Sequence, residues 1–187
     1  LFNIPDSVVS IGDYAFYGCT QLVEITTGEN IASIGNYAFS GCTALSKMNS
    51  ITTGSIIMFE GLESVGTYAF QNVANAKTIV VPSTVTSIGV SAFSGCSAIE
   101  SITLPFVGKN ATTNNTVDSV FGYVFGNNGN TEAEGTTKQY YKSSTSYYNF
   151  YFIPTTIKNV TITNQAVIPF GAFSNCNFIE RVDLSEN

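Results

Sequence analysis

The chain has 187 residues, of which 44% are hydrophobic, so it is long enough to bury a sizeable core. Charged residues make up only 11%, and seven scattered Lys and Arg face thirteen Asp and Glu, for a net charge of -6. Because nucleic-acid binding depends on clustered basic side chains, this composition excludes it as a partner. The sequence contains no run of about 18 apolar residues, so it predicts no membrane span.

One phrase, Ile-Gly-x-Tyr-Ala-Phe-x-Gly-Cys, recurs along the chain with small variations. The first two copies are 23 residues apart, and so are the third and fourth. A period of this length indicates a solenoid, in which each unit buries its apolar face only against its neighbours. The five copies occupy residues 11–19, 34–42, 65–73, 88–96 and 168–176.

Each copy is followed by a short segment in which β-branched and apolar residues alternate with polar ones, which predicts a strand. Stacked coils place such strands side by side in a parallel sheet. A second extended segment, Pro-x-x-Val-x-x-Ile-Gly, precedes the next copy, and the Ala-Phe-x-x-Cys part is short enough to predict a single helical or 3₁₀ turn. The predicted strands lie at 22–26, 45–48, 76–81, 99–104, 157–162 and 179–184.

Two residue types of the phrase are expected in the interior. The Phe of each copy should point inward, so that the rings stack in a row. The four cysteines share one slot of the repeat, which holds Val73 in the third copy, so we interpret them as small buried core residues. The predicted row consists of Phe16, Phe39, Phe70, Phe93 and Phe173. The predicted buried slot holds Cys19, Cys42, Cys96 and Cys176.

The repeat is interrupted twice. Residues 50–59 carry an excess of eight residues between Phe39 and Phe70. Between Phe93 and Phe173 the spacing is 80, and within it residues 121–125 resemble a shortened turn whose Phe125 would continue the row. The remainder, about 126–151, is predicted to protrude as a polar and aromatic loop or hairpin. Long ordered insertions are often functional, so both interruptions are candidate sites.

The consensus Ile-Pro-x-x-Val-x-x-Ile-Gly-x-x-Ala-Phe-x-x-Cys-x-x-Leu-x-x-Ile resembles the BspA-like leucine-rich repeat over nearly the whole chain. The resemblance implies a leucine-rich-repeat solenoid: a β-rich α/β right-handed superhelix of about six to seven coils with a parallel strand ladder. It also implies a secreted or surface-attached protein, usually bacterial, and characterised relatives act in adhesion. We expect a single domain over 1–187, with an irregular inserted unit at about 105–153. Neither end carries a polar capping unit, which suggests a fragment of a longer chain.

Catalysis and metal binding find little support in the residues. The chain has no His, which removes the commonest general base, and it has no Cys-x-x-Cys pair for zinc. The paired carboxylates Glu60 with Glu63 and Glu132 with Glu134 are more simply solvated surface charges. Glu132 and Glu134 lie among Asn residues but lack the spacing of a calcium loop. We therefore expect no enzyme, no cofactor and no metal.

Two surfaces are candidates for binding. Residues 139–152 are rich in tyrosine, which favours recognition because its large ring has few rotatable bonds; the alternative is packing against the solenoid. The outer face of the predicted sheet carries small polar and balanced charged residues, and its alternative is a plain solvated face. The candidate binding residues are Tyr140, Tyr141, Tyr147, Tyr148, Tyr151, Lys47, Lys77, Glu100, Lys158 and Arg181.

These features predict an extracellular or cell-surface module that binds a protein or glycan of a host or neighbouring cell, in adhesion. The surface location comes from the family resemblance, because residues 1–187 show no signal peptide. The alternative is a passive spacer or stalk of a surface protein that self-associates end to end.

Overall fold

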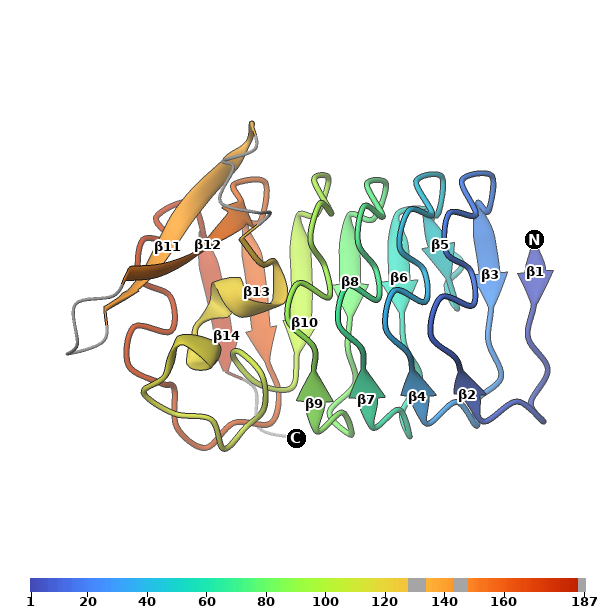
Figure 1. The fold of residues 1–187 in the computed structure, drawn as a ribbon, viewed down its shortest axis with the longest axis horizontal. Coiled ribbons are helices and arrows are strands. Elements are labelled where there is room, and N and C mark those ends of the chain that lie inside the picture. Colours follow the sequence, from blue (N-terminus) through green and yellow to red (C-terminus); the bar gives the residue numbers. More distant parts are fainter. Residues whose placement is uncertain (128–133, 143–147, 185–187) are drawn as a thin grey trace.

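The computed structural model describes residues 1–127, 134–142 and 148–184 of the chain. They form coils stacked along the long axis of the molecule, as the repeat predicts (Figure 1). Two parallel sheets run along this stack. The long sheet has the order β1 (Phe2–Asn3), β3 (Glu24–Thr26), β5 (Lys47–Met48), β6 (Ser55–Ile57), β8 (Thr78–Val80), β10 (Ser101–Leu104), β13 (Asn159–Ile162) and β14 (Arg181–Leu184). The short sheet has the order β2 (Ser10–Ile11), β4 (Ser33–Ile34), β7 (Ser64–Val65) and β9 (Ser87–Ile88).

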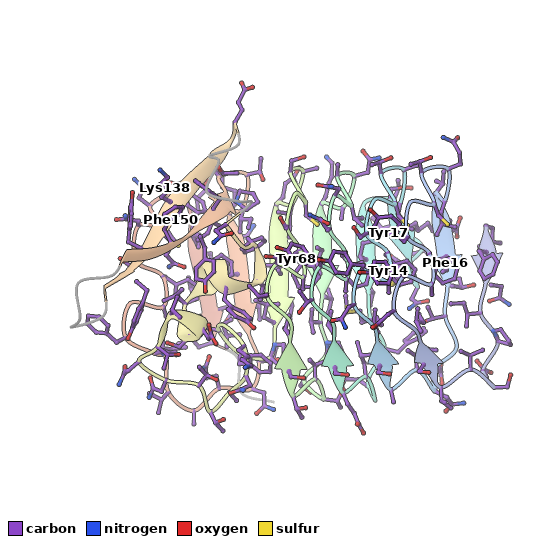
Figure 2. The ribbon with its side chains drawn as sticks, viewed as in Figure 1. Tyr14, Phe16, Tyr17, Tyr68, Lys138 and Phe150 are labelled. Atoms are coloured by element: carbon purple, nitrogen blue, oxygen red, sulfur yellow. The ribbon has the colours of Figure 1, made fainter. Side chains whose placement is uncertain are left out.

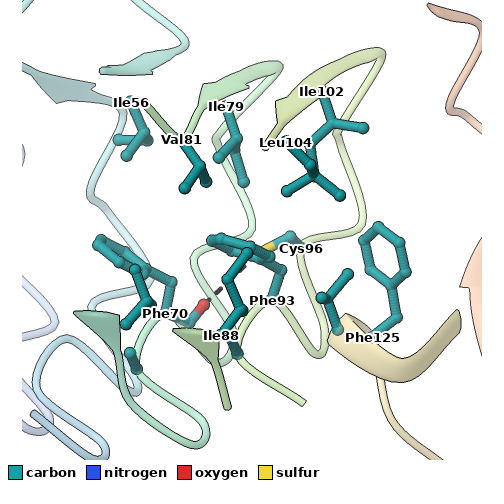
Figure 3. Packing of buried hydrophobic residues seen from close by; sticks show 14 of the residues in the cluster. Ile56, Phe70, Ile79, Val81, Ile88, Phe93, Cys96, Ile102, Leu104 and Phe125 are labelled. Atoms are coloured by element: carbon teal, nitrogen blue, oxygen red, sulfur yellow. Dashed lines mark hydrogen bonds between the residues drawn. The ribbon is translucent and has the colours of Figure 1, made fainter. Parts of the chain in front are cut away.

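The strands are short because each coil turns after two to four paired residues, and alternation decides which side chains face inward. In the long sheet Ile25, Ile79 and Ile102 are buried between exposed or half-buried neighbours. In the short sheet the inward side chain is the second residue of each strand, such as Ile34 or Ile88. The core therefore lies between the two sheets and the turns that join them (Figure 3).

The turn of each phrase follows the predicted 3₁₀ pattern. In the first copy the N–H groups of Ala15 and Cys19 donate to carbonyls three residues earlier. The same turn also bonds to the next coil, since the Phe16 N–H donates to the Ala38 carbonyl at 2.8 Å. Of the predicted phenylalanine row, Phe16, Phe39, Phe70 and Phe93 stack as expected, with ring centroids 5.1, 5.1 and 5.8 Å apart. The fifth predicted member, Phe173, contacts Phe121 in a tilted arrangement.

The first interruption, residues 50–59, contributes a strand to the long sheet. Residues 55–57 form β6, which lies between β5 and β8 and is parallel to both. The chain leaves β5 at Asn49, which has a left-handed backbone (φ 50°). The Asn49 side chain then joins neighbouring coils, accepting from the Thr27 N–H and donating to the Ile57 carbonyl. The excess residues therefore add a strand to the long sheet.

The second interruption contains a coil of irregular shape and a hairpin. Two 3₁₀ helices, η1 (Val117–Ser119) and η2 (Phe121–Val124), take the place of a regular turn. Phe93 N–H donates to the Val124 carbonyl, so Phe125 takes the next place after Phe93 and is buried. The Phe121 ring then contacts both Phe125 and Phe173, at 5.3 Å each. The antiparallel hairpin of β11 (Thr136–Lys142) and β12 (Tyr148–Pro154) follows before β13.

Three of the four cysteines are buried, as predicted, and burial raises their thiol pKa values: to about 11 for Cys42 and to about 12 for Cys96 and Cys176. Cys96 donates to the Phe70 carbonyl at 3.3 Å (Figure 3). Cys19 is exposed, which corrects the expectation of a uniformly buried slot. Among the described residues, the turn that carries Cys19 is covered by a neighbouring coil on one side only, that of Cys42.

Thiol reactivity should follow this division. At pH 8 we expect Ellman's reagent to titrate one thiol rapidly, that of Cys19, because the buried thiols are shielded and protonated. The other three should react only after unfolding in urea. Since burial raises those pKa values, the associated stability is complete below about pH 9 and is lost as pH rises toward 12. The folded Cys19→Ser variant should have no rapidly reacting thiol, and any rapid reaction in it would contradict this assignment.

The phenylalanine row should carry much of the stability. Phe70 is fully buried between two rings, so Phe70→Ala should lower the free energy of unfolding by about 3–5 kcal/mol. Phe16 is only partly buried at the outer coil, so Phe16→Ala should cost clearly less. Urea unfolding followed by circular dichroism measures both. Equal losses would show that the rings do not act through burial.

Candidate functional site

The charged residues predicted for binding all lie on the outer face of the long sheet. Lys47 and Arg181 belong to strands β5 and β14, and the other three directly precede β8, β10 or β13. Strand pairing places one residue of each strand in a column on this face, including Ser55 of β6, which is buried. This column reads Glu24, Lys47, Ser55, Thr78, Ser101, Asn159 and Arg181.

Each of these charges has an opposite partner on the same face. Nitrogen–oxygen distances are 2.8 Å for Lys47 with Glu24, 3.3 Å for Lys77 with Glu100, 3.6 Å for Lys158 with Glu180 and 2.9 Å for Arg181 with Asp183. The first three pairs join neighbouring coils. Exposed pairs of this kind add little stability, since water screens them. Their main effect is to give the face a nearly neutral charge.

Apolar side chains stand within this polar face. Ile57 of β6 pairs with Val80 of β8, and both are half-buried. The same row continues through Thr103 and Thr161, which expose methyl and hydroxyl groups. An apolar centre with a polar rim is the usual composition of a protein interface.

The hairpin is fixed to the solenoid by a residue that the sequence did not single out. Gln139 of β11 is fully buried. Its Oε1 accepts the Gly122 N–H at 2.6 Å, and its Nε2 donates to the carbonyls of Ala172 at 2.9 Å and Ser174 at 3.1 Å. This amide thus joins η2 to the last repeat. Gly122 is needed beside it, because an added Cβ would lie 2.5 Å from the Tyr151 Cβ.

The tyrosines predicted for binding lie on opposite faces of the hairpin. Tyr141 and Tyr151 are 8% and 7% exposed and face the solenoid, where the Tyr141 hydroxyl donates to the Asn115 carbonyl and the Tyr151 ring contacts Tyr123. Tyr140 is 41% exposed and lies on the opposite face near Phe150, over which Lys138 places its ammonium group (Figure 2). Tyr147 and the Tyr148 side chain lie outside the described residues. The hairpin and the charged face therefore form two separate surfaces.

The recurring Tyr of the repeat, which is not among the candidate binding residues, forms a second tyrosine surface. Tyr14, Tyr37 and Tyr68, here called the tyrosine row, occupy the same slot of successive turns. Their ring centroids stack at 4.9 and 5.0 Å, and all three have left-handed backbones, with φ between 54° and 58°. Burial, followed by the neighbouring phenols, raises the pKa of Tyr37. The signal that could have revealed it was the recurring Tyr itself.

The repeat geometry also produces a groove. The groove has a volume of about 470 Å³, crosses β4, β7 and β9, and ends at Lys109 and Tyr123. Burial, followed by the nearby Asp118 charge, raises the pKa of Tyr123 to about 12, so its phenol stays neutral. Its lining contains no carboxylate. Of the predicted carboxylate pairs, Glu60, Glu63 and Glu134 are exposed, and Glu132 lies outside the described residues.

The described residues lack the features of a metal site and of a membrane-spanning helix. They contain no cluster of three or more His, Cys, Asp or Glu side chains placed to hold a metal ion. They also contain no helix with the length and apolar character needed to cross a membrane.

Comparison with protein families gives a direct match. Six copies of the BspA type leucine-rich repeat region cover residues 1–105 and 48–179. This chain belongs to the BspA-type leucine-rich repeat family. The comparison with curated proteins finds no match.

Among solved structures similar to this chain, the first described below supports the same fold. A leucine-rich repeat protein from T. pallidum is 19% identical with a TM-score of 0.58, and the alignment covers 99% of this chain and 69% of that one. One from Bacteroides ovatus is 22% identical, with a TM-score of 0.47 and coverage of 99% and 49%. A leucine rich cell surface protein from Faecalibacterium prausnitzii is 21% identical, with a TM-score of 0.32 and coverage of 98% and 60%. At these identities the likeness concerns the fold alone.

The role of Gln139 is testable with a matched glutamine. Gln139→Leu leaves the buried Gly122 N–H without a partner and removes the amide's bonds to the Ala172 and Ser174 carbonyls, so the free energy of unfolding should fall by about 1–3 kcal/mol. Gln71→Leu removes one half-exposed contact to Ser40 and should cost less than about 1 kcal/mol. Hydrogen exchange should also accelerate across β11 and β12 in Gln139→Leu only. Unchanged exchange there would show that the amide does not hold the hairpin.

Proposed function

We propose that this chain is an extracellular, cell-surface interaction module that binds a protein partner in adhesion, through the outer face of the long sheet. The observation that carries the proposal is that Lys47, Lys77, Glu100, Lys158 and Arg181 share one face although they come from different repeats. A regular sheet built on a stacked core holds such side chains in fixed relative positions. Little ordering is then required on binding.

The chemistry of this face suits a protein partner of low net charge. Ile57 and Val80 supply an apolar centre, and Thr103 and Thr161 extend it with small side chains. The ion pairs lie around this centre, where charges contribute specificity more than affinity. Lys77 and Glu100 are 62% and 58% exposed, so they can exchange their mutual contact for contacts with a partner.

The hairpin offers a second contact surface. Tyr141, Tyr151 and Gln139 fix its inner face, which leaves Tyr140 and Phe150 to present aromatic area on the outer face. The surface location of the protein is supported by family membership and by the name of the relative from Faecalibacterium prausnitzii, a cell surface protein.

The test is a binding screen followed by variants of the sheet face. The chain, displayed on a sensor, is exposed to an array of extracellular matrix proteins and to a second copy of itself. Thr103→Arg places a bulky charge at the centre of the face and should weaken binding to the captured protein at least tenfold. Lys77→Ala with Glu100→Ala should weaken it by a smaller factor while keeping the net charge.

Glu60→Ala with Glu63→Ala is the control, since both carboxylates are exposed away from this face. It should leave the dissociation constant unchanged. Absence of binding to any matrix protein, or equal binding by wild type and Thr103→Arg, would refute the proposed surface. Binding only to the second copy would favour a self-associating stalk.

A further inference from the structure

The groove over the short sheet is a distinct surface whose floor consists of small polar residues. Ser33, Ser64 and Ser87 stand at the first position of β4, β7 and β9, and strand pairing sets them in register. With Ser10 of β2 they form a row, here called the serine row, along the solenoid axis. Adjacent members are one strand spacing apart, about 4.8 Å. The groove therefore offers a repeating set of hydroxyl groups to an elongated ligand.

These hydroxyl groups are not used by the fold. Within the described residues, the side chains of Ser33, Ser64 and Ser87 make no hydrogen bond. Asn36 and Thr67 continue the lining beside them, and the Asn36 side chain holds the coils in register by accepting the Thr67 N–H at 2.9 Å. Each free hydroxyl can both donate and accept a hydrogen bond.

The tyrosine row adjoins the groove. Tyr37 and Tyr68 directly follow the lining residues Asn36 and Thr67, and the Tyr14 and Tyr68 rings lie along the same axis (Figure 2). A left-handed backbone costs a residue other than glycine about 1–2 kcal/mol, and the last repeat places Gly171 in this slot with φ 69°. Three repeats nevertheless keep Tyr. Stacking of the rings offsets part of that cost.

The composition of the groove excludes other ligand classes. Its lining has one charged side chain, Lys109 at one end, so it does not match a phosphate polymer or a strongly charged peptide. The backbone groups of β4 and β7 are already paired on both sides, and on the free side of β9 the Ile88 N–H already donates to the Lys109 carbonyl, which disfavours strand addition. A ligand must bind to a face made of hydroxyl, amide and aromatic groups.

We propose that this groove binds a linear polysaccharide of uncharged sugars lying along the solenoid axis. Sugar hydroxyls would pair with the serine row and Asn36, while the tyrosine row and Tyr123 would contact the apolar faces and edges of the sugar rings. Successive coils offer equivalent groups one strand spacing apart, about 4.8 Å, to a ligand that lies along this axis. This site is separate from the protein-binding face of the long sheet.

Affinity gel electrophoresis tests the proposal with soluble polysaccharides cast in the gel. The uncharged probes are hydroxyethyl cellulose, mixed-linkage β-glucan, galactomannan and pullulan, and polygalacturonate is the charged comparison. At least one uncharged probe should retard the wild-type chain. Ser64→Tyr fills the groove and should weaken retardation at least tenfold, and Tyr68→Ala should weaken it several-fold.

The matched control is Ser101→Tyr. Ser101, like Ser64, is the half-buried first residue of a strand, but it lies on the outer face of the long sheet. It should bind the probe as wild type does, and thermal melting establishes that all variants fold. No retardation by any uncharged probe, retardation by polygalacturonate alone, or equal losses in Ser64→Tyr and Ser101→Tyr would overturn the proposal. Thr103→Arg should keep its retardation, so failure at this site is distinguishable from failure of the protein-binding face.

Discussion

Backbone hydrogen bonding from one coil to the next is the constraint on which the whole molecule depends. The strands of both sheets pair with the equivalent strands of neighbouring coils, and the turns do the same, as the Phe16 N–H to Ala38 carbonyl bond shows. Because this pairing fixes the spacing, every slot of the repeat becomes a row along the axis. The phenylalanine, tyrosine and serine rows and the ion-paired face are all products of the same spacing.

Rows that repeat are the part of the structure that the sequence could predict. Phe39 and Phe70 could be placed in the core because the same residue returned at the same slot of the repeat. Lys77 and Glu100 could be placed on the outer face because they occupy one equivalent, outward-facing slot. Cys19 shows the limit of that argument, because the thiols of Cys42 and Cys96 pack against the turn of the preceding coil and no such turn precedes Cys19 among the described residues. The tyrosine row was equally repeated, but the left-handed backbone that presents it required the structure.

Features formed by a single residue were not predictable. Gln139 has partners at Gly122, Ala172 and Ser174, which are far away in the sequence and are brought together by the irregular coil. Residues 50–59 were too few to suggest another strand, and β6 forms only because Asn49 allows the chain to leave β5 and return in parallel. Likewise, the groove depends on Lys109 and Tyr123, which come from the irregular unit and close one end of a regular face.

The additional strand β6 also changes the spacing of the coils on one side of the molecule. It widens the long sheet by one strand spacing between β5 and β8, whereas β4 and β7 of the same coils remain directly paired. Lys47 and Thr78 of these two coils are therefore separated by Ser55 of β6, while Thr78 and Ser101 of the next two coils are direct neighbours. A partner that spans the outer face must thus match an uneven spacing of repeats, and this uneven spacing distinguishes one position along the solenoid from the others.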